Sequence, residues 1–141
     1  MVEFLAPGRS GESADRFIGG LGWKSPLELI APDLLLLETA SALRKLAMLR
    51  SISDAAADRA VSRLPQVGIA TITTAVLLAD AWALRKRLTI YDAVYVALAK
   101  NLGLPLVTAD VRLVRAIKGT NVKSWLLDDP KLKQHLDVMD R

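Results

Sequence analysis

The sequence contains no cysteine and a single histidine, His135. Without cysteine the chain can form no disulfide, no thiolate metal site and no cysteine nucleophile. With one histidine, neither a histidine-rich zinc site nor a Ser-His-Asp triad is expected. A metal ion bound by this chain would therefore be a hard cation held by oxygen ligands.

Long apolar runs and aromatic residues are also scarce. No apolar run approaches the roughly 20 residues that span a bilayer. Residues 1–9 carry an acid at position 3 and lack the basic and apolar regions of a signal peptide. The sequence therefore predicts a cytoplasmic protein whose core is built mainly from Leu, Ala, Val and Ile.

The chain has 141 residues, of which 52% are hydrophobic. This length and composition predict a single domain over residues 1–141, with a charged peripheral tail from about residue 128. The net charge of +4 suits a polyanionic partner, although most basic residues on a small domain simply face solvent.

Helical and strand patterns alternate along the chain. The pattern predicts a largely buried helix that begins at Pro32 or Asp33 and ends near Leu49. Ser53 and Thr89 are expected to start helices and Gly103 to end one. Further helices are expected at 13–18, 54–64, 75–87, 90–101 and 110–117, and strands at 67–72, 105–108 and 121–125. This alternation predicts an α/β fold with parallel strand pairing.

Three acids lie in strongly apolar segments: Glu38, Asp92 and Asp110. A buried carboxylate without a partner costs several kcal/mol, so each acid needs compensation. Ordinary structural roles are available. Glu38 could pair with Arg44, Asp92 could complete a capping box with Thr89, and Asp110 could be an N-cap.

The same three acids could instead form one site. Two of them lie near helix starts that follow strands or loops, where ligands gather in open α/β sheets. If all three converge, their charges repel unless a divalent cation neutralises them. Mg²⁺ or Mn²⁺ held by carboxylates and water fits a chain without cysteine, and such a site can promote phosphodiester cleavage.

Three motifs carry these acids. They are LETASALRK at 37–45, LTIYDAVYVALA at 88–99 and LVTADVRL at 106–113. Each resembles an acid-bearing segment of the VapC-type toxins of the PIN-domain family, and their order and separations are also similar. The resemblance covers essentially residues 1–127.

The resemblance implies a three-layer α/β/α sandwich around a mostly parallel sheet. It implies a Mg²⁺- or Mn²⁺-dependent endoribonuclease, the toxin of a toxin–antitoxin pair, which cuts RNA, is neutralised by a VapB-type antitoxin and forms a homodimer. Glu38, Asp92 and Asp110 would be the catalytic metal ligands. Thr108 would support the site through hydrogen bonds, and Arg112 would contact substrate phosphate or orient an acid.

The N-terminus departs from the family pattern. The family begins with a buried strand that ends in an aspartate, whereas residues 1–5 resemble the helix that follows it. Neither Asp15 nor Asp33 occupies the position of that aspartate. Either Met1 is an internal methionine of a longer reading frame, or the strand is truly lost. A chain without the strand is expected to be a weak or inactive nuclease.

Two other functions remain open. One is a catalytically impaired PIN fold that binds an antitoxin or RNA without cutting. The other is a helical scaffold in which each acid only caps or pairs. Trp23, Trp82 and Trp125 are expected in the core or in an interface, because none lies in a basic, aromatic-interleaved stretch typical of base stacking.

Overall fold

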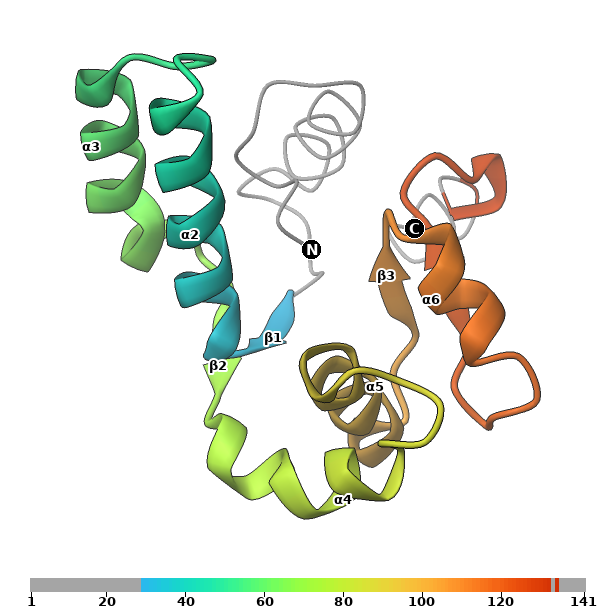
Figure 1. The fold of residues 1–141 in the computed structure, drawn as a ribbon. Coiled ribbons are helices and arrows are strands. Elements are labelled where there is room, and N and C mark those ends of the chain that lie inside the picture. Colours follow the sequence, from blue (N-terminus) through green and yellow to red (C-terminus); the bar gives the residue numbers. More distant parts are fainter. Residues whose placement is uncertain (1–28, 133, 135–141) are drawn as a thin grey trace. The chain divides into compact units, whose positions relative to one another are not determined.

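The computed structural model describes residues 29–132 and 134 (Figure 1). The elements predicted at 1–5 and 13–18, the departure at the N-terminus, and His135 lie outside these residues. The chain divides into two compact units, Met1–Thr71 and Ile72–Arg141. Each unit is described by itself.

The described part of unit 1 combines two paired strands with two helices. Its described elements are β1 (Ile30–Pro32), α2 (Leu34–Met48), α3 (Asp54–Arg63), the 3₁₀ turn η2 (Leu64–Gln66) and β2 (Ala70–Ile72), which reaches one residue past the unit. β1 and β2 form a two-stranded sheet, and the Ala70 amide donates to the Leu29 carbonyl at 2.9 Å. Figure 1 shows α2 and α3 packed side by side.

Helix α2 differs from its prediction in two ways. Pro32 belongs to β1, so the helix begins at Leu34 with Asp33 as its N-cap. The helix is also not largely buried, because Leu35, Thr39 and Leu43 are its only buried residues. Apolar side chains cover most of α2, yet one stripe alone is packed away from solvent.

Helix α3 begins where the sequence predicts. Ser53 has extended backbone angles, and its hydroxyl accepts a hydrogen bond from the Ala56 amide at 3.2 Å. This is the bond by which an N-cap satisfies one of the free amides of the first turn. The strand expected at 67–72 is shorter than predicted, since Gly68 takes a left-handed φ of 72° before β2 begins.

Unit 2 contains a parallel strand pair. Its described elements are η3 (Thr74–Leu77), α4 (Leu78–Ala83), α5 (Ile90–Leu102), β3 (Leu106–Thr108), α6 (Val111–Ala116) and β4 (Ser124–Leu126). β3 and β4 pair in parallel, with Leu106 opposite Ser124 and Thr108 opposite Leu126. The connection between them carries α6, as a parallel crossover requires. The predicted α/β class with parallel pairing is confirmed.

Helix α5 supplies more buried residues than any other described element of unit 2. Every residue from Ala93 to Ala99 is buried. Thr89 caps the helix at its start, and Gly103 ends it with a left-handed φ of 63°. Glycine suits this position because it has no Cβ to oppose the left-handed conformation. Both predicted ends of this helix are confirmed.

The helix predicted at 75–87 is wrong in its extent. The segment divides into η3 and the short α4, which ends at Ala83. After it the chain turns through bonds to carbonyls three residues back, from Leu84 to Ala81 and from Arg87 to Leu84. Such bonds tighten a helix end and stop it. Trp82 is 58% exposed, so it does not belong to the core.

None of the helices in the described residues is long and apolar enough to cross a membrane.

Candidate metal centre

Asp92 lies in the first turn of α5 and is half-buried. The Thr89 hydroxyl accepts a hydrogen bond from the Asp92 amide at 3.2 Å and donates to Asp92 Oδ2 at 3.0 Å. The bond from the Asp92 amide is the N-cap half of the predicted capping box, whereas the other bond joins the two side chains. The second bond holds the carboxylate through Oδ2 and does not use Oδ1.

Asp110 is the N-cap of α6 and is exposed. Its Oδ1 atom accepts hydrogen bonds from the Arg112 amide at 2.8 Å and the Leu113 amide at 3.3 Å. Its own amide donates to the hydroxyl of Thr108 at 3.1 Å, and Thr108 is buried at the end of β3. These bonds connect β3, the Asp110 N-cap and α6. None of them uses Asp110 Oδ2.

Arg112 is the second residue of α6 and its side chain is exposed. Its amide binds the Asp110 carboxylate, which places its Cα within one helical turn of that acid. The bond runs through the backbone, so it leaves the guanidinium available for an anion from solution.

Glu38 lies in unit 1, in the second turn of α2. It follows the exposed Leu37 and precedes the buried Thr39, and its own side chain is half-buried. Glu38 therefore stands at the margin of the buried stripe of α2.

The three acids fall into two units, with Glu38 in unit 1 and Asp92 and Asp110 in unit 2. Within neither unit do the described residues gather three or more carboxylate or imidazole groups suited to a metal ion. The meeting of all three acids therefore stays a prediction. What the structure provides is two aspartates fixed by hydrogen bonds to one carboxylate oxygen each. Carboxylate oxygens are the donors that Mg²⁺ and Mn²⁺ prefer, so the residues fit such an ion.

One contact in unit 2 was missed by the sequence interpretation. Arg87 donates from Nη2 to the carbonyls of Ala116 at 2.9 Å and Lys118 at 3.2 Å. The charge pattern placed this arginine in the last turn of the helix predicted at 75–87. Because its partners are 29 and 31 residues away in the chain, no local pattern could have indicated the contact.

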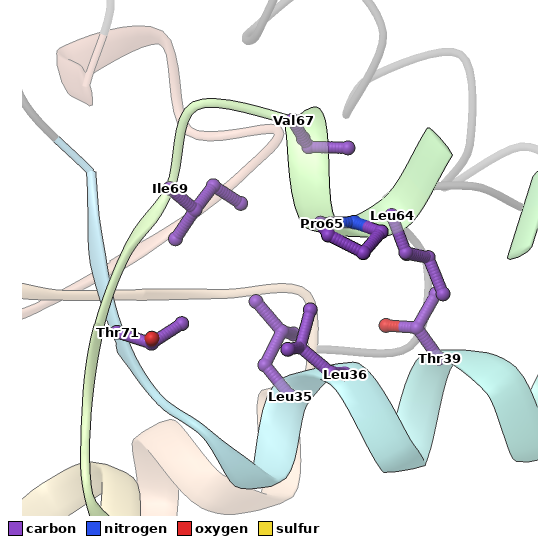
Figure 2. A pocket seen from close by; sticks show the side chains of 8 residues that line it. All are labelled: Leu35, Leu36, Thr39, Leu64, Pro65, Val67, Ile69 and Thr71. Atoms are coloured by element: carbon purple, nitrogen blue, oxygen red, sulfur yellow. The ribbon is translucent and has the colours of Figure 1, made fainter. Parts of the chain in front are cut away.

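A cavity in unit 1 has no part in this chemistry. It has a volume of about 260 Å³ and is bounded by α2, η2 and the segment that leads into β2 (Figure 2). The described residues that line it are Leu35, Leu36, Thr39, Leu64, Pro65, Val67, Ile69 and Thr71, and the Thr39 and Thr71 hydroxyls are the only polar side-chain groups among these. Glu38, Asp92 and Asp110 are not among these residues, so the cavity is not lined by the candidate metal ligands.

Comparison with known proteins places these motifs in a family. The PIN domain model matches residues 1–119. Ribonuclease VapC3 of Mycobacterium tuberculosis is 40% identical over 79 residues, which cover 56% of this chain and 58% of the relative. Ribonuclease VapC1 of the same organism is 40% identical over 87 residues, 61% of this chain and 65% of the relative.

A third relative, VapC ribonuclease Mb0985 of Mycobacterium bovis, is 39% identical over 85 residues, 60% of this chain and 67% of the relative. The matches thus span less than two thirds of the length of VapC3 and VapC1 and about two thirds of Mb0985. With a domain model that covers most of its length and with these relatives, the chain belongs to the PIN domain family as a VapC-type member.

Proposed function

We propose that this chain is a Mg²⁺- or Mn²⁺-dependent endoribonuclease that acts as the toxin of a VapBC-type pair. The observation that carries the proposal is the way two family-type acids are held. Asp92 and Asp110 both lie at helix starts of unit 2, each fixed by hydrogen bonds from neighbouring groups. A purely helix-capping role would explain each of these contacts by itself. It would not explain why acids occur in three VapC-like motifs.

Glu38, Asp92 and Asp110 would be the metal ligands. When bound, a divalent cation activates a water molecule and stabilises negative charge on phosphate oxygens. The chain itself orients the donors, because Thr89 holds the Asp92 carboxylate and the first amides of α6 hold that of Asp110.

Two neighbours would complete the site. Thr108 fixes the backbone of Asp110 through its hydroxyl. The exposed Arg112, two residues from that acid, would contact a phosphate of the RNA.

The partners follow from the same proposal. The substrate would be RNA, which suits the net charge of +4 and the names of the ribonuclease relatives. A VapB-type antitoxin would neutralise the toxin, and two copies of the chain would form a homodimer.

The test is RNA cleavage, expected to be weak, by the purified 141-residue chain with Mn²⁺ or Mg²⁺, and with EDTA added. We expect cleavage to require the metal and to fall by about 100-fold or more in Asp92→Asn, Asp110→Asn and Glu38→Gln. Asparagine caps helices about as well as aspartate, so Asp110→Asn should keep its melting temperature while it loses activity. Asp58→Asn, an exposed acid of α3, is the matched control and should cut at the wild-type rate.

Two results would contradict the proposal. Cleavage that persists in all three variants would show that these acids are not the metal ligands. RNA or antitoxin binding by the folded wild-type chain, with no cleavage at any metal concentration, would instead identify a catalytically impaired binding module.

A further inference from the structure

We infer that Arg87 is a positioning residue that holds α6, and with it Asp110, against the turn that leads into α5. The inference rests on the proposed function in so far as Asp110 is a metal ligand. The observation behind the inference does not depend on that function. The Arg87 guanidinium donates to the carbonyls of Ala116 and Lys118, at the end of α6 opposite Asp110.

Helix α6 needs support from outside. It has six residues, too few for a helix to be stable in isolation. The last carbonyls of any helix lack partners within the helix, and a cation beside them is favourable because the helix dipole is negative there. Arg87 supplies both the donors and the charge. Without the Arg87 side chain, the carbonyls of Ala116 and Lys118 would lose these donors.

The contact at one end of α6 bears on the acid at the other. A six-residue helix is only about 9 Å long, so a shift at Ala116 is transmitted to Asp110. Arg87 is itself fixed, because its amide donates to the Leu84 carbonyl at 2.9 Å. It also precedes Thr89, the residue that orients Asp92, by two positions. The Arg87 side chain therefore links the turn that leads into α5 to the end of α6.

Arg85 provides a matched control two residues away. Its guanidinium lies 4.9 Å from the ring centre of Trp82 and donates to the Trp82 carbonyl at 3.0 Å. Both contacts stay at the end of α4, so they do not reach α6. The two arginines share charge and exposure but differ in what they hold.

The experiment compares Arg87→Ala, Arg87→Lys and Arg85→Ala in the full chain. RNA cleavage is measured as separate kcat and KM values, and amide hydrogen exchange is measured at Arg112 and Leu113, whose amides bind the Asp110 carboxylate. We expect Arg87→Ala to lower kcat on the order of tenfold with KM nearly unchanged, since a misplaced ligand affects the reaction more than binding. Exchange at the two amides should accelerate. Arg87→Lys keeps the charge, so it should recover part of the kcat and part of the slow amide exchange. Arg85→Ala should resemble wild type in both measurements.

Several outcomes would overturn the inference. A rise in KM alone would make Arg87 an RNA contact, and equal behaviour of Arg87→Ala and Arg85→Ala would show that it positions nothing. If Arg87→Ala does not fold, Arg87→Lys decides, because wild-type exchange and kcat in that variant would contradict a role for the two-carbonyl contact. If the wild-type chain does not cut RNA, the proposed function fails, and unchanged amide exchange would then refute the link to Asp110 separately.

Discussion

Helices α2 and α5 have similar compositions but different surroundings. Both are rich in apolar residues, and each carries one family-type acid, Glu38 or Asp92. In α5 seven consecutive residues, Ala93–Ala99, are buried, whereas Leu37 in α2 is 70% exposed. An apolar sequence therefore shows that a helix has a surface to bury, but not how much of it the fold covers.

The helix ends differ in the same way. α5 ends at Gly103 in the left-handed conformation that glycine adopts without strain. α2 ends at Met48 with Leu49 as its C-cap, and the left-handed position after the cap is occupied by Arg50, with φ 55°. Burial and a glycine at the C-terminal end thus both favour the α5 helix. Helix α2 is less buried, and a non-glycine residue takes the left-handed position after it.

The largest expected effect tests the difference in burial directly. Val96 of α5 is 1% exposed, so Val96→Asp places an unpaired charge in the core. We expect a loss on the order of 4 kcal/mol in the free energy of unfolding. Leu37→Asp makes the same kind of change on the exposed side of α2 and should cost less than about 0.5 kcal/mol. Urea denaturation measures both, and similar losses would mean that Leu37 is covered in solution.

A smaller effect is expected within α2 itself. Leu43 is 2% exposed in the buried stripe, and Leu43→Ala should destabilise the chain by roughly 3 kcal/mol because it leaves a cavity. Met48 lies on the same helix but is 67% exposed. Met48→Ala should therefore change the unfolding free energy by under about 0.5 kcal/mol. Equal losses in the two variants would refute the single buried stripe.

The smallest effect concerns the two helix ends. Gly103→Ala introduces a Cβ at a left-handed position, and although space surrounds it, we expect a loss of about 1 kcal/mol from backbone strain. Arg50→Gly relieves the same strain after α2 and should stabilise by up to about 1 kcal/mol. Opposite shifts in melting temperature would confirm the contrast between the ends. A stabilising Gly103→Ala would contradict it.

Local patterns predicted those features that depend on nearby residues. The caps at Ser53, Thr89 and Gly103 were predicted because each acts within three or four residues of its own position. The parallel pairing of β3 and β4 followed from the alternation of strands and helices. Family membership followed from the motifs around the three acids.

Other features were predicted wrongly because interactions outside the predicted pattern decided them. The sequence placed Pro32 in the first turn of a helix, yet pairing with β2 draws that segment into β1. The helix expected at 75–87 has good helix formers near its end, but three-residue turns after Ala83 stop it early.

The sequence by itself determined the family and the capping of α3, α5 and α6, and it singled out three acids whose common site stays a prediction. These rest on residue type and on spacings of a few positions, which the chain carries before it folds. Only the tertiary structure decided which side of α2 is buried and which carbonyls Arg87 holds. Burial depends on the neighbours that a helix meets, and a hydrogen bond between residues 29 positions apart exists only once folding has brought them together.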